Sequence, residues 1–199
     1  MKAFIMVALS LIAQIATAGG GWISSGGESL IYARNPWFVK NTASVDYCIQ
    51  MDEASFSISK AEVEKLIVQA FSYWKSEFQI NSNFKESPAG FAKVATQEFN
   101  YLTKCQDHTP LIFKLGIQTL GNDEINYLVD PKKYIGVTIR KNYSLTQLQG
   151  DGIIYISADK GPDTYTNNGQ LMTQAWQSPV LMRYVFIHEL GHFFGIIFL

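Results

Sequence analysis

Residues 57–78 read SISKAEVEKLIVQAFSYWKSEF, a stretch that predicts a helix both at its start and through its interior. Ser59 is followed three residues later by Glu62, a capping-box pattern in which the two side chains satisfy backbone donors that the first turn leaves unpaired. Apolar residues then recur at helical spacing in one continuous stripe: Val63, Leu66, Ile67, Ala70, Phe71, Trp74 and Phe78. Core packing explains the aromatic members of this stripe more simply than a cofactor site does. We therefore expect a helix of about five turns lying on a sheet.

Segments typical of β-strands lie on both sides of this helix. Residues 44–50 alternate between apolar and polar side chains, which predicts a half-buried strand. The residues on its apolar face are Val45, Tyr47 and Ile49. Residues 91–102 are expected to form a short helix. Three apolar segments bounded by Gly, Pro, Asn or Asp then predict further strands at residues 111–117, 135–139 and 153–157.

A second helix is predicted near the end of the chain. Ser178 is a favoured N-cap, and Pro179 suits the first helical position because it has no N–H to leave unpaired. The helix is expected to run through Phe193 or Phe194 to Gly195, which suits a left-handed cap. Before it, residues 158–177 are expected to form a solvated loop; their carboxylates, among them Asp159 and Asp163, could hold calcium but lack the spacing of a known calcium loop.

Composition and the first residues place the chain among exported single-domain proteins. Hydrophobic residues make up 47% and charged residues 17% of the 199, enough for a substantial core. A net charge of −1 argues against a nucleic-acid or anionic-membrane surface. Residues 1–18 have the pattern of a secretory signal peptide, and their apolar run is shorter than the roughly 20 residues that a membrane anchor needs. We expect a flexible segment at 19–33 and one domain at 34–199.

Two cysteines, Cys48 and Cys105, are present in this exported chain. A disulfide between them is the first interpretation, because export leads to an oxidising compartment. Two separate buried thiols are the alternative. A third interpretation makes Cys105 and His108 metal ligands, although Cys-x-x-His is a short and common spacing.

The second helix carries the motif His188-Glu189-Leu190-Gly191-His192. Histidines four residues apart project from one helix face, where two neutral imidazole nitrogens can bind one Zn²⁺. Glu189 is then placed to act as general base on a zinc-bound water and to pass the proton to the leaving amine. This motif predicts a zinc-dependent peptidase when it lies on a helix.

HELGHFFG, residues 188–195, resembles the first eight residues of the metzincin signature His-Glu-x-x-His-x-x-Gly-x-x-His. Residues 34–49 and the helix after them, with Ala70 and Trp74, are similar to the start of a matrixin-type catalytic domain. GDGIIYIS, residues 150–157, resembles the strand that precedes the active-site segment of that family.

The resemblance implies an α+β fold, the metzincin-like N-terminal subdomain: a twisted, mixed five-stranded sheet with two long helices, the second carrying the zinc motif. It also implies endopeptidase activity on an extended polypeptide that pairs with an edge strand. We place that edge strand at residues 153–157.

The chain departs from the family pattern at its end. Phe198 stands where the third zinc-binding histidine is expected, and a phenyl ring cannot ligate zinc. His108, a carboxylate from residues 159–163, or water are the substitutes to consider. The apolar ending FFGIIFL, without a Met-turn or the C-terminal subdomain, predicts a domain cut in its middle. No cysteine-switch propeptide is visible.

Three hypotheses follow for the function. The first is a secreted or periplasmic zinc metalloendopeptidase with His188 and His192 as metal ligands and Glu189 as base, Zn²⁺ as cofactor and structural calcium as an option. Its partner is a polypeptide substrate, with no nucleic acid and no membrane after signal cleavage. The second is a truncated, catalytically impaired relative that serves as an exported binding module or is a non-functional remnant. The third is an exported structural or envelope-interaction domain in which HELGH is incidental.

Overall fold

The computed structural model describes residues 23–24, 43–81, 91–144, 149–158, 166–167, 170–171 and 177–194. These residues form an α+β fold around a mixed sheet with strand order β1-β5-β6-β4-β2-β3. The strands are β1 (Ile23–Ser24), β2 (Ser44–Met51), β3 (Glu98–Leu102), β4 (Leu111–Leu115), β5 (Gly136–Ser144) and β6 (Gln149–Ile156). A separate pair consists of β7 (Thr166–Asn167) and β8 (Gln170–Leu171). The expected five-stranded mixed sheet is thus present, with the two-residue β1 added at one edge.

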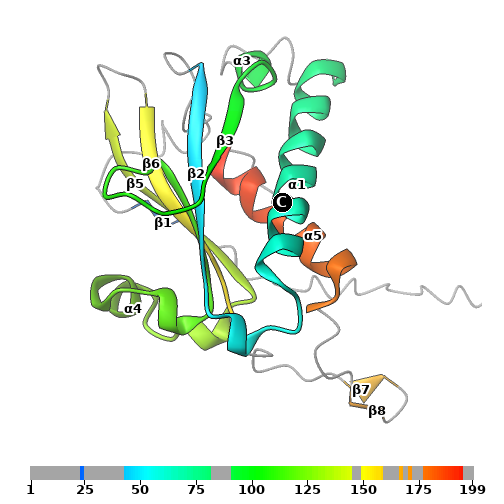
Figure 1. The fold of residues 1–199 in the computed structure, drawn as a ribbon, viewed down its shortest axis with the longest axis vertical. Coiled ribbons are helices and arrows are strands. Elements are labelled where there is room, and N and C mark those ends of the chain that lie inside the picture. Colours follow the sequence, from blue (N-terminus) through cyan, green and yellow to red (C-terminus); the bar gives the residue numbers. More distant parts are fainter. Residues whose placement is uncertain are drawn as a thin grey trace, which may run out of the picture.

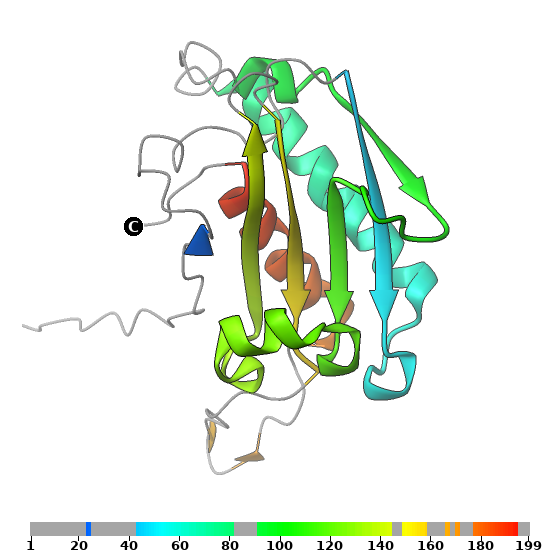
Figure 2. The ribbon, with the colours of Figure 1, turned by 90° about the vertical axis from the view of Figure 1, so that its left-hand side faces the viewer.

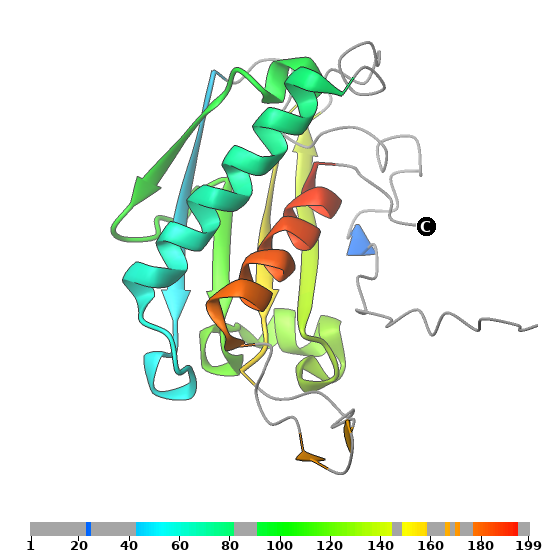
Figure 3. The ribbon, with the colours of Figure 1, turned by 90° about the vertical axis from the view of Figure 1, so that its right-hand side faces the viewer.

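The helices lie on both faces of the sheet. The two long helices, α1 (Lys60–Ile80) and α5 (Pro179–Phe193), pack side by side on one face (Figures 1 and 3). The short α4 (Asn122–Leu128) lies at the other face (Figure 2). The other helical turns in the described residues are α3 (Phe91–Val94) and the 3-10 turns at Glu53–Ser55, Ile117–Thr119 and Pro131–Lys133.

The structure confirms the predicted basis of α1. Ser59 accepts a hydrogen bond from the N–H of Glu62, and the Glu62 carboxylate accepts one from the N–H of Ser59. The buried residues of α1 are the seven of the predicted stripe. They pack on Val45, Tyr47 and Ile49, so the predicted inward face of β2 is confirmed as well.

The order of the strands corrects the predicted edge. β6, which contains Ile153, lies between β4 and β5, with a parallel ladder to β4 and an antiparallel one to β5. Both sets of its backbone groups are therefore occupied, and the prediction that residues 153–157 form the edge strand is wrong. β5 lies further out, and its outer side pairs in parallel with β1, Ile23 opposite Ile139. Ile23 and Ser24 fall within the segment expected to be flexible.

The prediction for residues 91–102 holds only at its beginning. Residues 91–94 form α3, but residues 98–102 form β3, the edge strand next to β2. Phe99 and Tyr101 pack toward the core, where the ring of Phe99 stacks on Phe71 with centroids 4.0 Å apart. Packing of Phe99 on Phe71 and of Tyr101 on Tyr47 favours an extended strand over a continued helix.

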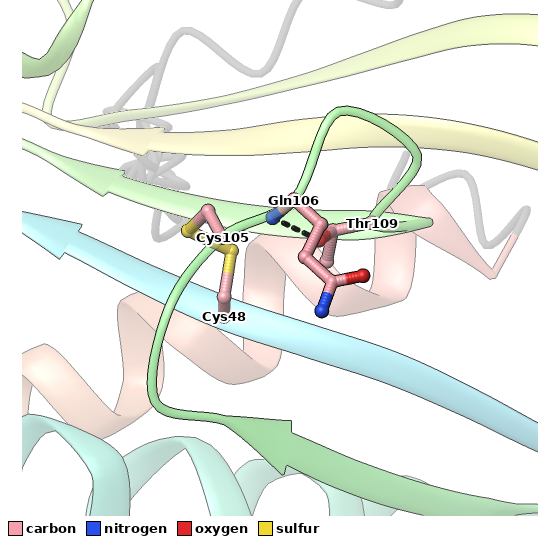
Figure 4. The surroundings of a disulfide bond; sticks show 4 residues. All are labelled: Cys48, Cys105, Gln106 and Thr109. Atoms are coloured by element: carbon pink, nitrogen blue, oxygen red, sulfur yellow. Dashed lines mark hydrogen bonds between the residues drawn. A yellow bond between two sulfur atoms is a disulfide. The ribbon is translucent and has the colours of Figure 1, made fainter.

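The disulfide between Cys48 and Cys105 is confirmed, with Cα atoms 5.3 Å apart. It joins β2 to the segment that follows β3, beside a turn in which the hydroxyl of Thr109 accepts a hydrogen bond from the N–H of Gln106 (Figure 4). The cysteines are therefore neither separate thiols nor metal ligands, and the interpretation of Cys105 with His108 as a metal pair is wrong.

Several predictions concern residues outside the described ranges. They include the signal peptide at 1–18, the loop carboxylates Asp159 and Asp163, and the end of the chain with Gly195 and Phe198. Within the described ranges, no helix has the length and apolar character needed to cross a membrane.

Candidate metal centre

Helix α5 begins where its sequence predicts. The hydroxyl of Ser178 accepts a hydrogen bond from the N–H of Leu181, and Pro179 occupies the first turn. The face that α5 turns toward the sheet buries Met182, Phe186, Leu190 and Phe193. This packing fixes the rotation of the helix and with it the direction in which the HELGH residues point.

The two histidines of the motif come together. Nε2 of His188 and Nε2 of His192 lie 2.9 Å apart, with ring planes at 89°. Two neutral imidazoles at this distance can share one hydrogen, and their tautomers decide which ring donates and which accepts. A tetrahedral Zn²⁺ with bonds of roughly 2.0–2.1 Å holds two ligand nitrogens roughly 3.3 Å apart, so the rings need to open by only a few tenths of an ångström. The donor pair therefore fits a zinc ion.

Burial also favours the metal-binding form of His188. The ring is half-buried, and this desolvation lowers its pKa. A lower pKa keeps the imidazole neutral, which is the form whose nitrogen lone pair can ligate a metal.

Glu189 is buried against β5 rather than exposed. Its side chain is 1% exposed, and Oε2 lies 2.8 Å from the hydroxyl oxygen of Thr138, which also lies 2.7 Å from the carbonyl oxygen of Glu189. On the adjacent side, a Cβ added to Gly136 would come within 2.7 Å of Oε1 of Glu189. The missing side chain of Gly136 and the hydroxyl of Thr138 thus form a close-fitting site for this carboxyl group.

The protonation of Glu189 follows from this environment. Burial raises its pKa to about 7, against a smaller lowering by the hydrogen bond with Thr138. A hydroxyl has one hydrogen, so Thr138 can donate to only one of the two Glu189 oxygens at a time. When the carboxyl is protonated it can donate to Thr138 in turn, and both short contacts are then hydrogen bonds.

Two more side chains hold the backbone of the motif. The guanidinium of Arg140, 3% exposed, donates to the carbonyl oxygens of His192 and Phe193, both at 2.9 Å. These carbonyls belong to the last turn of α5, where carbonyls have no partner within the helix and a cation is favourable. At the other end, the indole N–H of Trp74 donates to the carbonyl oxygen of Ile187 at 2.7 Å. Residues 187–193 are therefore held from both α1 and β5.

Among the described residues, the structure brings together two imidazoles but no third ligand. His108 is exposed in the turn before β4. Within the part of the chain that the structure describes, no three His, Cys, Asp or Glu residues lie close enough to share a metal. The substitution of His108 for the third ligand therefore finds no support.

Thr138, Arg140 and Gly136 were not singled out from the sequence. They lie 51 to 53 positions from the groups they contact, on a strand that the sequence marks only by its apolar residues. A buried arginine in the alternation Val137-Thr138-Ile139-Arg140 is the one signal that could have indicated a polar contact on the face of β5 toward α5.

No family model matches the chain, and no similar protein is found among the curated ones.

Proposed function

We propose that this protein is an exported zinc-dependent metalloendopeptidase of the metzincin type, resembling the matrixins. The observation that carries the proposal is the convergence of Nε2 of His188 and Nε2 of His192, 2.9 Å apart, on a helix whose intervening glutamate is buried. Two histidines four residues apart can occur by chance on any helix. Here the residue after His188, Glu189, has its carboxyl group held in one position by Thr138 of β5.

The residues of the HELGH motif and their neighbours have separate roles in the proposed reaction. His188 and His192 would hold the Zn²⁺, which supplies a Lewis acid that polarises a carbonyl and lowers the pKa of water. Glu189 accepts the proton from the attacking water and delivers it to the leaving amine, a role that suits a carboxyl whose pKa lies near neutrality. Trp74 and Arg140 keep the helix in place during these steps.

The polypeptide substrate is assigned to the outer side of β5. This strand contacts α5 through Thr138 and Arg140, so its outer side lies next to the motif. β1 pairs there over two residues only, opposite Ile139 and Arg140, and this pairing supports the ability of β5 to bind an extended chain; a substrate would pair along β5 beside β1 or displace it. The export signal at residues 1–18 and the disulfide support a secreted or periplasmic location.

Metal analysis and a peptide-hydrolysis assay test the proposal together. Glu189→Ala is expected to abolish hydrolysis and to retain zinc, whereas the double change of His188 and His192 to Ala is expected to lose both. Glu53→Ala and His108→Ala are the matched controls, because both residues are exposed and neither contacts the motif in the described structure. Full turnover in Glu189→Ala would contradict the proposal.

A second candidate function is a catalytically impaired relative that acts as an exported binding module. One observation favours it, namely that the described residues supply two imidazoles and no third ligand. Affinity for zinc depends on the number and geometry of ligands. This candidate predicts less than one zinc per chain after dialysis and no proteolysis that a chelator can inhibit.

A further inference from the structure

The close-fitting site around the Glu189 carboxyl is formed by β5, not by the helix that carries the motif. Thr138 reaches Oε2 at 2.8 Å and the carbonyl oxygen of the same residue at 2.7 Å, so one hydroxyl contacts both the side chain and the backbone of Glu189. Two contacts from one atom fix the carboxyl relative to the helix axis.

Gly136 completes the site on the adjacent side, two residues before Thr138 on β5. A Cβ at this position would lie 2.7 Å from Oε1 and 2.9 Å from Cγ of Glu189, closer than neighbouring atoms tolerate. The carboxyl therefore has Thr138 as hydrogen-bond partner and Gly136 as the backbone surface against which it rests. All three residues are buried.

We propose that Thr138 is the positioning residue for Glu189, and that its hydroxyl, with the space left by Gly136, holds the carboxyl where it acts as base. The inference rests on the proposed peptidase function for its effect on rate, but the contact itself concerns residues of this chain alone. Thr138 does not reach the two imidazole nitrogens in the described contacts, so its loss should affect proton transfer and not metal binding.

The test compares Thr138→Val, which keeps the shape and removes the hydroxyl, with Thr138→Ser, which keeps the hydroxyl. Thr138→Val should lower kcat about tenfold, the effect of losing one buried hydrogen bond, and leave KM and zinc content unchanged. Thr138→Ser should restore most of the rate. Gly136→Ala should lower kcat at least as much, because its methyl group would displace the carboxyl.

The matched control is Thr119→Val. Thr119 also donates one short hydrogen bond, 2.7 Å to the carbonyl oxygen of Gly116, but it lies in the turn after β4. The kcat of the Thr119→Val variant should equal that of the wild type. A Thr138→Val enzyme with unchanged kcat would overturn the proposal, and so would a loss of rate accompanied by loss of zinc or of the folded state, since Thr138 would then be merely structural.

A second measurement does not need activity. The ¹³Cδ chemical shift of Glu189, assigned by its disappearance in Glu189→Gln, should move in Thr138→Val and return in Thr138→Ser. If the wild type hydrolyses no peptide, the peptidase proposal fails. The chemical shift then tests by itself whether the hydroxyl of Thr138 contacts the Glu189 carboxyl. An unmoved resonance in Thr138→Val would overturn it.

Discussion

The indole nitrogen of Trp74 lies 2.7 Å from the carbonyl oxygen of Ile187, which joins the middle of α1 to the residue just before His188. Trp74 is 4% exposed and also stacks on Phe78. The two helices that cover one face of the sheet are thus fixed to each other by a specific hydrogen bond and not by apolar packing alone. This hydrogen bond fixes the position of the HELGH segment, residues 188–192, relative to α1.

Replacing Trp74 with Phe should therefore destabilise the protein by about 2 kcal/mol, combining a lost hydrogen bond with a smaller ring in the core. Urea denaturation followed by circular dichroism measures the change. Tyr73→Phe is the control, because the neighbouring side chain is 38% exposed and should change stability by less than about 0.5 kcal/mol. Equal losses in both variants would rule out a specific role for the indole.

Gly152 allows the end of α5 to approach β6. A Cβ at this position would lie against the carbonyl oxygen of Ile139 and 2.8 Å from Cε2 of Phe193. Gly152→Ala should cost about 3 kcal/mol of stability, because either the strand or the ring has to move. In Gly121→Ala the new Cβ would find its nearest atom, Oε2 of Glu124, at 3.8 Å, so its thermal midpoint should remain close to that of the wild type.

Glu124 connects α4 to the sheet. Its carboxylate accepts hydrogen bonds from Lys114 at 2.6 Å and from Lys141 at 2.9 Å. Burial alone would raise its pKa, but the bonds from Lys114, from the N–H of Gly121 and from Lys141 outweigh burial and lower it below 4.5. A lowered pKa in the folded state means that the stabilisation is complete above pH 4.5 and is lost as the pH falls through the folded-state value.

Glu124→Gln should thus lower stability by about 2 kcal/mol at pH 7 and by progressively less in acid. Denaturation curves from pH 7 down to pH 3 measure the difference. Asp123→Asn, at an exposed position of the same helix, is the matched control and should change stability at pH 7 by less than about 0.5 kcal/mol. A Glu124→Gln deficit that stays constant down to pH 3 would show that the charge is not its source.

In the metal-free protein, the contribution of Glu189 to stability depends on pH in the opposite direction from that of Glu124. Burial raises its pKa from 4.5 to about 7, so the folded state binds the proton more tightly than the unfolded chain does. The stability of the wild type should then fall as the pH rises from 4.5 to about 7. Glu189→Gln cannot ionise, so its stability relative to the wild type should increase over this range by up to about 3 kcal/mol.

Urea titrations with a chelator present, at pH 4.5 and pH 8, measure this difference. Glu53→Gln serves as the reference, since Glu53 is exposed and its variant should keep the pH profile of the wild type. Identical profiles for Glu189→Gln and the wild type would mean that the carboxyl is not buried as described.

The parts of the fold with strong local signals were predictable. Local sequence alone predicts the capping box and the apolar stripe of α1. The same holds for the start of α5 at Ser178 and Pro179, and neither prediction needs knowledge of the rest of the chain. The same is true of the spacing that brings His188 and His192 together. In each case the local pattern and the tertiary packing favour the same structure.

The missed elements depend on distant partners. α4 has only seven residues, and the polar partners that hold it to the sheet, Lys114 and Lys141, come from two other strands. In β3, Phe99 and Tyr101 alternate with polar residues as in a strand. The helical segment directly before β3 made the change from helical to strand spacing hard to recognise from the sequence. The order of the strands, which places β6 inside the sheet and not at its edge, is likewise a property of the whole sheet.

The candidate site shows the same division. The sequence supplies the chemical groups, His188, Glu189 and His192, because they share one helical turn. It cannot supply the residues that orient them, because Thr138 and Arg140 are more than 50 positions away.

The disulfide has a mechanical consequence. Cys48 and Cys105 are 57 positions apart, and the segment between them contains all of α1 and β3. Fully drawn out, 57 residues would span roughly 200 Å. With the cross-link intact, tension applied at the two ends passes from one cysteine directly to the other and never reaches this segment. The segment between the cysteines, including the helix whose Trp74 holds Ile187 beside the HELGH residues, is therefore shielded from pulling for as long as the two sulfur atoms stay joined.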